Sequence, residues 1–495
     1  MAQGRYIAVD LGAESGRVMC ATVGTDGIAL TEAHRFANGP VAVGKNLYWD
    51  ILRLWSEIQV GIAKTVAAHG AADINGIGVD SWGVDFALLD GRGELLGNPV
   101  HYRAARTKGA PEKLYARLPR EKVYALTGIQ TLPFNTVFQL SAVAAENPQI
   151  LAAARHVLFI PDLINYWLCG RLANEYTIAS TSQLLNARTR QWADEVLAAI
   201  QVPASLFCAP VMPGSVLGET FVEGRHGSTA GRRIPVLAVG SHDTASAVAA
   251  VPATGQDWLF LSSGTWSLLG VEVREPVLST AAMQYNLTNE GTVDGQIRLL
   301  KNIAGLWPLQ ECRRTWAAAG QSWSYGELVE LARTEPAHTA RLDLDDPTLA
   351  TPGDMPRKIT DQCRRRGYPA PESPGRFVRV ILESLAAEYA RVKLMLEEVT
   401  GRKFTRLHIV GGGSQNDLLN QFAADATGLQ VRTGPVEATA IGNVLAQAVA
   451  TGRMGSLTAG RELVAKTASI RVYESHDTES WQAWAAEPSA PRSSG

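Results

Sequence analysis

The sequence predicts an α/β protein of two domains, each built on a mixed sheet flanked by helices. Two hairpins with glycine-containing turns lie about half a chain apart, over residues 6–23 and residues 257–273. Elsewhere, short apolar runs that end in polar residues alternate with long amphipathic segments. Hairpins and helices in one unit are typical of a mixed sheet, and the second hairpin indicates a duplicated architecture. We expect each half to contribute one loop to a shared cleft.

Length and composition narrow the class of protein. The chain has 495 residues, of which 46% are hydrophobic and 19% charged, and its formal net charge is −2. A compact domain usually has about 100–200 residues, so this length allows two to four domains. The near-neutral charge argues against a nucleic-acid partner, and no apolar stretch reaches the about 18 residues of a membrane span. We therefore expect a cytoplasmic enzyme with no membrane contact and no obligate protein partner.

The secondary structure follows from apolar runs and their periodicity. In the first hairpin, a strand over residues 6–10 ends in an aspartate and a return strand covers residues 17–23. In the second, strands 257–261 and 266–273 flank the turn 262–265. The other predicted strands are 76–80, 84–90, 235–239 and 407–410, and the predicted helices are 49–69, 243–250, 377–399 and 416–427.

The same pattern suggests how the domains divide. We predict an N-terminal domain over residues 1–252 and a C-terminal domain over residues 253–475, followed by a disordered tail over 476–495 that is rich in Ser, Pro and Ala. Residues 335–374 have many prolines and charges and little periodicity, so they are predicted to be an insertion or surface loop.

Several common catalytic motifs are absent from the chain. It has no G-x-x-x-x-G-K-[ST] phosphate loop, no H-E-x-x-H and no G-x-S-x-G. The glycines at 411–413 lack the third glycine of a dinucleotide fingerprint, because Asn416 stands there. The five cysteines are scattered and form no CxxC pair, which argues against disulfides and a zinc site.

The residues that remain fit the binding of a polyphosphate. Backbone N–H groups of glycine turns can converge on phosphate oxygens without a lysine, and two such turns occur at Gly12–Gly16 and Gly264–Thr265. Asp10, at the strand end beside the first turn, is placed to hold Mg²⁺ directly or through water. Arg17, at the far end of that turn, could neutralise charge on a transferred phosphoryl group. Glycine turns and strand-end aspartates are also common without any such role.

Asp243 is the candidate general base. It follows an apolar strand and begins a helix, so its carboxylate could accept the proton of a substrate hydroxyl during phosphoryl transfer. His242 and Thr244 would then flank it as hydrogen-bonding partners of a polyol. An aspartate at the start of a helix can equally be an N-cap and nothing more.

Two further segments have a composition suited to ligand binding. Asp80, Trp82, Gly83 and Asp85 combine a flat apolar ring with hydroxyl acceptors, as sugar sites do, although a core tryptophan with two surface aspartates fits as well. The glycines at 411–413 would let a nucleotide base lie against the backbone, and Asn416 could cap the next helix or contact the base. The residues alone assign no role to the remaining polar pair in an apolar stretch, Asn302 and Gln310.

Seven motifs, taken in order, resemble the FGGY family of carbohydrate kinases. They span residues 5–473, almost the whole chain, and their order is far more specific than any one of them. The motifs are strand–Asp10–turn–Arg17, Gly78–Phe86, Ser241–Ala247, Leu261–Ser267, Leu300–Trp307, His408–Gly413 and Gly434–Thr439.

The resemblance implies a two-domain actin-like (ribonuclease H-like) fold that closes over ATP and a sugar. It implies ATP-dependent phosphorylation of the ketose L-rhamnulose at its 1-hydroxyl, in L-rhamnose breakdown, with Asp243 as the proton acceptor. By position it also assigns contacts with the sugar and with ATP. The implied sugar contacts are Gly83, His242, Asp243, Thr244 and Asn302, and the implied ATP contacts are Ala13, Glu14, Ser15, Gly16, Arg17, Thr265, Gln310 and Gly412.

Two departures from the family pattern bear on these expectations. The Lys-x-x-Trp pattern of many FGGY kinases is absent from residues 133–140, which argues against glycerol or xylulose as the substrate. Glu14 stands in the phosphate turn where relatives usually have a small residue, so we predict that its side chain points to solvent or aids Mg²⁺. The alternatives are a kinase for another deoxy-ketose such as L-fuculose and a non-catalytic actin-like nucleotide-binding regulator.

Overall fold

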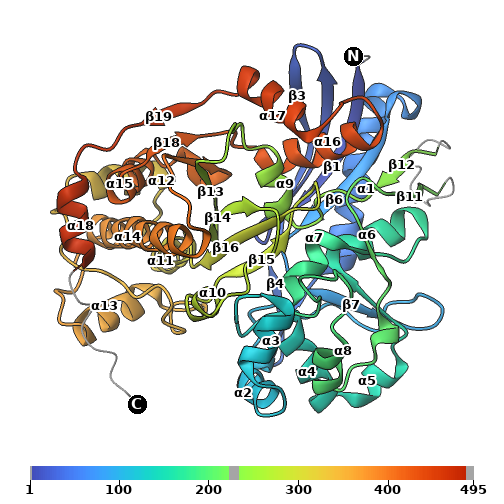
Figure 1. Cartoon of the computed structure of the whole chain (residues 1–495), viewed down its shortest axis with the longest axis horizontal. Helices are drawn as coiled ribbons and strands as arrows, with labels where there is room; N and C mark the ends of the chain where they lie inside the picture. The colour runs from blue at the N-terminus through green and yellow to red at the C-terminus, as the bar shows by residue number, and fades with distance from the viewer. Residues whose placement is uncertain (1–2, 222–232, 487–495) are drawn as a thin grey trace. The chain divides into compact units, whose positions relative to one another are not determined.

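The computed structural model describes residues 3–221 and 233–486 (Figure 1). The chain divides into two compact units. The first comprises residues 1–253, 272–299 and 437–468, and the second comprises residues 254–271, 300–436 and 469–495. The first division falls one residue from the predicted boundary, but two later segments return to the first unit, so neither unit is one continuous stretch of chain.

The first unit is built on a six-stranded mixed sheet with the order β11-β12-β6-β1-β2-β3. Strand β1 pairs in parallel with β6 and in antiparallel with β2, and β12 pairs in parallel with β6. The predicted first hairpin is therefore confirmed as β1 and β2. The strands are β1 (Gly4–Leu11), β2 (Ser15–Gly24), β3 (Gly27–Ala37), β6 (Gly76–Ser81), β11 (Val216–Glu219) and β12 (Pro235–Leu237).

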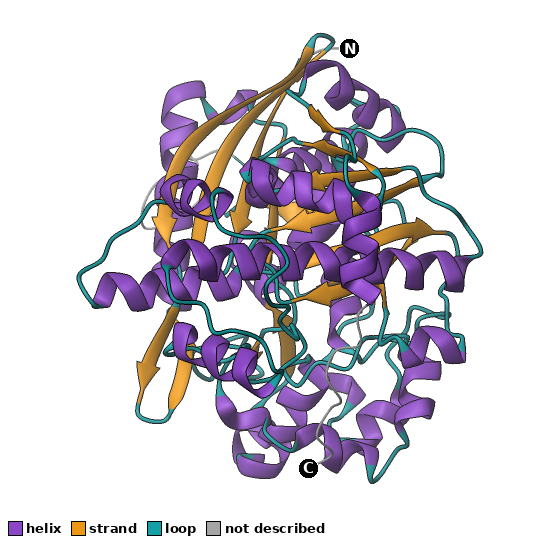
Figure 2. Cartoon of the chain, turned by 90° about the vertical axis from the view of Figure 1, so that its left-hand side faces the viewer, coloured by secondary structure: helices purple, strands orange, loops and turns teal. Residues whose placement is uncertain are grey.

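Helices α1 (Ile51–His69) and α16 (Ala438–Ala450) cover opposite faces of this sheet. A Cβ on Gly61 of α1 would touch Val18, whose partner across the hairpin is Val9. A Cβ on Gly78 would touch Asn443 of α16, and Gly78 pairs with Ala8. Because neighbouring residues of a strand point to opposite faces, the two helices lie on different sides. Figure 2 shows the strands between helices.

Packing on this sheet explains why residues 437–468 belong to the first unit. The amide Nε2 of Gln447 donates to the carbonyl of Ile7 at 2.9 Å, and α16 also packs closely against α9 (Asp243–Ala249). Helix α17 (Leu457–Thr467) contacts β3. The bond between Gln447 and Ile7 joins residues that are 440 positions apart in the sequence.

A second apolar core of the first unit lies among its shorter helices. Phe138, Phe159, Ile178 and Leu184 are fully buried there. The elements around this core and the remaining elements of the unit are β4 (Pro40–Val43), β5 (Asn46–Trp49), β7 (Phe86–Leu89), α2 (Ala110–Tyr115), α3 (Arg120–Thr127), α4 (Thr136–Glu146), α5 (Pro148–Ala153), β8 (His156–Phe159), α6 (Ile160–Cys169), β9 (Asn174–Glu175), α7 (Tyr176–Ala179), α8 (Asp194–Ala199), β10 (Pro210–Val211), α10 (Thr280–Gln284) and β15 (Thr288–Gly291).

The second unit is built on the strands around β13 and β17, which pair in parallel. Strands β13 and β14 form the predicted second hairpin, and helix α14 lies in the segment predicted as a helix over 377–399. The elements are β13 (Trp258–Ser263), β14 (Ser267–Val273), β16 (Ile297–Ile303), α11 (Trp307–Ala318), α12 (Tyr325–Arg333), α13 (Met355–Arg365), α14 (Pro374–Thr400), β17 (Arg406–Val410), α15 (Asp417–Thr427), β18 (Gln430–Thr433), β19 (Arg471–Tyr473) and α18 (Thr478–Ala486).

Two segments predicted to lack regular structure contain helices. Helix α13 lies within residues 335–374 and buries Met355, Ile359 and Cys363, which recur every four residues on one face. Helix α18 begins two residues into the predicted tail, and its Trp481 and Trp484 are buried against His338. The rest of that tail, residues 487–495, lies outside the described residues.

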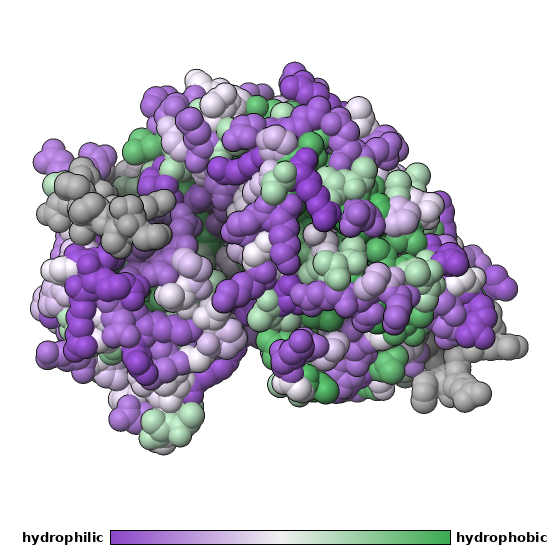
Figure 3. Space-filling model, turned by 90° about the horizontal axis from the view of Figure 1, so that it is seen from below, coloured by the Kyte–Doolittle hydropathy of each residue, from purple (hydrophilic) through white to green (hydrophobic). Residues whose placement is uncertain are grey.

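On the face visible in Figure 3, hydrophilic residues predominate on the left of the view, and hydrophobic residues are more frequent on the right. Within the described part of the chain, no helix combines the length and the apolar character that crossing a membrane requires.

Candidate functional site

Three acidic residues lie at one edge of the sheet of the first unit. Asp10 is the next-to-last residue of β1 and pairs in register with Asp80, the next-to-last residue of β6. The chain leaves β12 and runs beside β6, where the carbonyl of Ser241 accepts from the N–H of Ser81 at 2.9 Å, and Asp243 follows. The carboxyl ends of parallel strands meet at one sheet edge, which is where open α/β sheets bind ligands.

Asp10 is paired with the arginine directly opposite it in the hairpin. Nη2 of Arg17 donates to Oδ2 of Asp10, and Nη1 donates to Glu437, which immediately precedes α16. Although burial opposes the charge of Arg17, the two carboxylates raise the pKa of its guanidinium above the usual value. The cation at the end of the first glycine turn is therefore held between two acids.

Asp80 is fully buried behind this pair. Its Oδ2 accepts a hydrogen bond from Asn443 of α16 at 2.6 Å, whereas its Oδ1 has no partner among the described residues. Burial, and then the charges of Asp10 and Asp243, raise the pKa of Asp80 well above its usual range, against the opposing hydrogen bond from Asn443. A buried oxygen with no partner is rare, and such atoms are found at functional sites.

Asp243 is the first residue of α9, and the N-cap position belongs to His242. The interpretation of Asp243 as an N-cap is therefore wrong. Its side chain is 31% exposed, and Oδ1 accepts from the hydroxyl of Thr244 at 3.2 Å. Burial raises the pKa of the Asp243 carboxyl, His242 opposes that shift and Asp10 adds to it. A carboxylate with a raised pKa and a solvent-accessible face is suited to accept a proton.

The ring of His242 lies among three charged groups. Its Nε2 is 3.5 Å from Oδ1 of Asp243, and its Nδ1 is 3.3 Å from Oε2 of Glu290 and 3.2 Å from Nη2 of Arg298. Arg298 is fully buried, donates to Glu290 at 3.2 Å and donates through Nε to the carbonyl of Gly291 at 2.9 Å. Burial lowers the pKa of Arg298, and the charge of Glu290 opposes that shift. The ring orientation therefore depends on residues of β15 and β16.

Buried hydrogen bonds also fix the backbone that carries His242. The N–H of His242 donates to Oγ1 of Thr177 at 3.2 Å, and the N–H of Ser241 donates to Glu175 at 3.3 Å. Burial raises the pKa of Glu175 to about 7, although its hydrogen bonds, those from Thr177 first, oppose the shift. Glu175 and Thr177, at the start of α7, therefore hold the loop before α9. Displacing this loop would break their buried hydrogen bonds.

Gly83 lies against His242, as expected for two contacts of one ligand. A Cβ on Gly83 would stand 3.3 Å from Oγ1 of Thr181 and 3.4 Å from Nε2 of His242. The next residue, Val84, has φ +68°, a conformation that β-branched residues rarely adopt. Two hydrogen bonds hold it there, from its N–H to Thr181 at 3.2 Å and from Thr136 to its carbonyl at 2.7 Å. The structure therefore brings Gly83, His242, Asp243 and Thr244 together.

Trp82 and Asp85 do not present a sugar-binding face. Both side chains are buried, and the rings of Trp82 and Trp49 lie 3.9 Å apart. Oδ2 of Asp85 accepts from the indole nitrogens of Trp49 at 2.6 Å and of Trp82 at 3.1 Å. Burial raises the pKa of Asp85 to about 6, against hydrogen bonds of which that from Gln139 is the largest. This cluster supports the loop that carries Gly83.

The first glycine turn connects β1 and β2 through residues 12–14. The N–H of Gly12 donates to the carbonyl of Ser15 at 2.9 Å, and Nδ2 of Asn38, the residue after β3, donates to the carbonyl of Gly12 at 2.8 Å. Gly16 is a glycine for packing reasons, because a Cβ there would stand 2.3 Å from the ring of Phe36. The expected ATP contacts Ala13, Glu14 and Ser15 are all partly exposed.

In the second unit, the predicted turn at Gly264–Thr265 is held by the start of α11. The carbonyl of Gly264 accepts from the N–H of Leu306 at 3.0 Å, and the carbonyl of Thr265 accepts from the N–H of Trp307 at 3.2 Å. Gly305 permits this approach, because it has φ +45° and a Cβ there would stand 2.4 Å from the backbone of Trp266.

The glycines after β17 meet the end of β13 in the same unit. A Cβ on Gly413 would stand 2.0 Å from Oγ of Ser263, so this position requires a glycine. Gly412 is exposed with nothing within 4 Å of its Cβ direction, which leaves its backbone open to a flat ligand. Asn416 caps α15 by accepting from the N–H of Leu419 at 3.0 Å, so the capping interpretation is confirmed.

The two residues to which the sequence assigned no role are also in the second unit. Gln310 is on α11, and its Oε1 is buried without a hydrogen-bond partner among the described residues. Asn302 is on β16. An unpartnered amide oxygen fits a ligand that donates a hydrogen bond, as the amino group of an adenine does.

The acidic edge fits a magnesium ion that substrate phosphates help to hold. Asp10 and Asp80 offer the hard oxygen atoms that Mg²⁺ prefers, and Mg²⁺ usually takes one or two carboxylates together with phosphates and water. In the described ranges, no group of three or more His, Cys, Asp or Glu side chains is arranged to hold a metal ion.

Sequence reasoning missed the residues that support the site from distant segments. Glu175 precedes α7 and Thr177 lies within it, while Glu290 lies on β15 and Arg298 on β16. Glu437 precedes α16 and Asn443 lies within it. Arg298 alone left a clear signal, since it is a single charge inside the apolar run 297–300.

Comparisons with known proteins agree with this architecture. The N-terminal domain of the FGGY family of carbohydrate kinases matches residues 5–250, and its C-terminal domain matches residues 259–451. A curated rhamnulokinase from Bacteroides thetaiotaomicron is 44% identical over 478 residues, covering 97% of each chain. Rhamnulokinases from Yersinia pestis, 41% identical and covering 96% of each chain, and from Pectobacterium atrosepticum, 43% identical and covering 96% of this chain and 93% of that one, are also similar.

Solved structures share the fold at low sequence identity. The gluconate kinase of Lactobacillus acidophilus superposes with a TM-score of 0.77 at 16% identity, covering 98% of this chain and 96% of that one. The glycerol kinase of Plasmodium falciparum, solved with ADP, gives 0.76 at 15% identity, covering 97% and 96%. The expected actin-like fold is thus confirmed. With both domains matched along nearly its whole length, the chain belongs to the FGGY family of carbohydrate kinases.

Proposed function

We propose that this protein transfers the terminal phosphoryl group of ATP to the 1-hydroxyl of L-rhamnulose, giving L-rhamnulose 1-phosphate and ADP. The observation that carries the proposal is the accessible carboxylate of Asp243 beside Gly83 and His242 at the acidic edge of the sheet. The choice of sugar rests on the relatives named rhamnulokinase, which match over nearly their whole length. We place the reaction in the cytoplasm, where ATP is available and the five free cysteines stay reduced.

In this proposal Asp243 orients the 1-hydroxyl and takes its proton. The hydroxyl oxygen forms the new bond to the γ-phosphorus while the bond from that phosphorus to the β–γ bridging oxygen breaks, and ADP leaves with that electron pair. The proton passes to the Asp243 carboxylate late in the step. His242, Thr244, Gly83 and Asn302 bind the sugar and hold its hydroxyl toward that carboxylate.

The remaining assignments concern ATP. We assign Ala13, Glu14, Ser15 and Gly16 to the ATP phosphates, with Arg17 neutralising charge on the transferred group. Thr265, Gln310 and Gly412 of the second unit are assigned to the nucleotide. Asp10 would hold Mg²⁺, which when bound neutralises negative charge on the phosphate oxygens.

The substrate assignment is tested by measuring ADP release with L-rhamnulose, L-fuculose, D-xylulose and glycerol in parallel. We expect kcat/KM for L-rhamnulose to exceed that for each other compound by at least about 10²-fold, a difference of about 2.7 kcal/mol in transition-state stabilisation. Preference for L-fuculose would replace the substrate but keep the reaction. Binding of ATP without turnover of any of the four would instead favour the nucleotide-binding regulator.

A further inference from the structure

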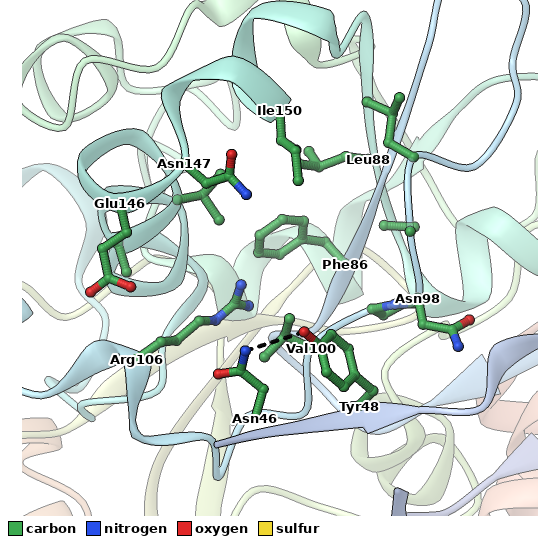
Figure 4. Close-up of a pocket in the computed structure, with 16 residues that line it drawn as sticks. Asn46, Tyr48, Phe86, Leu88, Asn98, Val100, Arg106, Glu146, Asn147 and Ile150 are labelled. Atoms are coloured by element: carbon green, nitrogen blue, oxygen red, sulfur yellow. Dashed lines mark hydrogen bonds between the residues drawn. The ribbon is translucent and has the colours of Figure 1, made fainter. Parts of the chain in front are cut away.

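The first unit contains a cavity of about 290 Å³ that none of the proposed sugar or nucleotide contacts lines. It lies between β5, β7, the segment 96–100 and helices α4 and α5, and Figure 4 shows its lining. A volume of this size is near the lower end of the range for small-molecule sites, about 300–1,000 Å³. The cavity is therefore large enough for a small organic ligand.

A guanidinium with an unsatisfied donor is the main polar group of this cavity. Nη2 of Arg106 donates to Oε1 of Gln139, but its Nε is buried and has no hydrogen-bond partner in the part of the chain that the structure describes. Burial lowers the pKa of Arg106 to about 10, against the attraction of Asp85 and then Glu146, so the group keeps its charge at neutral pH. A buried charge with an unused donor is costly, and an anion bound there would remove part of that cost.

Most of the other lining is apolar. Figure 4 shows the ring of Phe86 near the middle of the view, with Leu88 and Ile150 on one side of it and Arg106 on the other. The guanidinium carbon of Arg106 lies 5.8 Å from the centre of that ring. Glu146 also lines the cavity, but in the same view its carboxylate is turned away from Phe86. The cavity thus combines an apolar chamber with one cation facing into it.

Three amide side chains add neutral polar groups to the lining. Asn46, Asn98 and Asn147 line the cavity, and Asn46 donates to the hydroxyl of Tyr48 at 3.2 Å. Amides can donate to a carboxylate oxygen or accept from a ligand hydroxyl, and they add no charge that would repel an anion.

We propose that this cavity is a binding site for a small monocarboxylate with an apolar body, such as an aromatic or branched-chain acid. The carboxylate accepts hydrogen bonds from Nε of Arg106 and from the neighbouring amides, and the apolar body lies against Phe86, Leu88 and Ile150. Arginine is suited to this role because its rigid, planar donors match a carboxylate. A neutral ligand of the same shape would leave Nε of Arg106 without an anionic partner.

The hydrogen bond from Arg106 to Gln139 could also be purely structural, so the test must separate the two roles. Gln139 donates through Nε2 to Asp85 at 2.9 Å, and Asp85 supports the loop that carries Gly83. A structural role for Arg106 uses only Nη2 and predicts no ligand. A binding role predicts saturable binding that requires both the cation and the cavity.

Isothermal titration calorimetry of the full chain with benzoate, 3-methylbutanoate and the neutral analogue benzamide tests the proposal. A ligand of this size is expected to bind with Kd up to about 10 mM. We expect at least one acid to bind saturably, at least tenfold more tightly than benzamide. We expect at least tenfold weaker binding to Arg106→Gln, and no change in Arg92→Gln, an arginine whose side chain is 83% exposed.

A second variant locates the site without touching the cation. Val143 lines the cavity from α4, so Val143→Trp fills it, and we expect this change to abolish binding while the melting temperature shows that the protein is folded. The proposal is overturned if neither acid binds, if benzamide binds as tightly as benzoate, or if Val143→Trp binds like the unmodified chain. Should Arg106→Gln fail to fold, the Val143→Trp result decides alone.

Discussion

Oε2 of Glu290 lies 3.3 Å from Nδ1 of His242, on the side of the ring away from Asp243. Arg298 donates to the same carboxylate oxygen, so one buried acid holds both the histidine and the arginine behind it. His242 is thereby fixed with Nε2 toward Gly83 and Asp243. Glu290, on β15, therefore acts as a positioning residue for His242 in the proposed sugar site.

Replacing this acid tests whether the histidine must be held in place. Glu290→Gln keeps the shape but removes the charge that faces His242 and Arg298. We expect kcat/KM for the ketose to fall by about 10- to 10²-fold, because small displacements of positioning groups have effects of this size. The KM for ATP should stay within about twofold, a split that general destabilisation would not produce.

The matched control is Glu121→Gln on the exposed face of α3, which should leave both constants unchanged. Unaltered sugar kinetics in Glu290→Gln would show that the contact with His242 serves stability alone.

Asp243→Asn tests the general base directly. The amide is nearly the same size but cannot take a proton, so we expect kcat to fall by at least about 10²-fold. Binding of ATP, measured by titration calorimetry, should be retained, because Asp243 is assigned to the sugar hydroxyl. A variant with nearly normal kcat would reduce Asp243 to the first residue of a helix.

The pH profile of kcat/KM follows from the environment of the same carboxyl. Burial raises the pKa of Asp243 above that of a free aspartate, about 3.9, so the base becomes protonated at a higher pH than an exposed aspartate would. Activity should therefore be lost as the pH falls, with an apparent pKa above that of a free aspartate, and be regained at higher pH. An acid limb at or below the value of a free aspartate would contradict this assignment.

Asp10, Asp80 and Asp243 could be singled out from the sequence because each comes at or soon after the end of a short apolar run. The structure adds that they meet at one sheet edge, because β6 pairs in parallel with both β1 and β12. Gly83 and His242 were likewise assigned by their motifs. Their supports could not be predicted, because Glu290 and Glu437 come from segments that return to the first unit after long excursions of chain.

Composition misled the prediction in two places for a physical reason. Helix α13 is so polar that only a narrow face, including Ile359 and Cys363, is apolar, and its prolines and charges resemble those of a loop. The segment of α18 is rich in small residues. The three-residue spacing of Trp481 and Trp484, both buried, was its sign of a helix. In both segments a few buried side chains outweighed the average composition.

Gly83→Ala tests whether the space in front of His242 belongs to the substrate. The new methyl group would stand 3.3–3.4 Å from Thr181 and His242, close enough to occupy the surface that the sugar would touch. We expect KM for the ketose to rise at least about tenfold with little change in KM for ATP. Gly326→Ala on α12 is the control, because nothing lies within 4 Å of that position. Equal kinetics in the two variants would remove Gly83 from the sugar site.

The packing of α16 on α9 gives a test that is independent of the substrate. A Cβ on Gly442 would stand 1.7 Å from the carbonyl oxygen of Ser246, and this contact is with backbone, so the two helices would have to separate. Overpacking of this kind costs about 1–3 kcal/mol or more. We expect Gly442→Ala to lower the melting temperature, whereas Gly455→Ala, with nothing within 4 Å, should not.

The same substitution should also reach the acidic edge. Helix α16 carries Asn443, which binds Asp80, and begins directly after Glu437, which binds Arg17. Moving the helix therefore disturbs the contacts of Asp80 and of Arg17 at once. We expect KM for ATP to rise in folded Gly442→Ala, measured at a temperature well below its melting point. A stable variant with unchanged ATP kinetics would show that the edge does not depend on how closely α16 approaches α9.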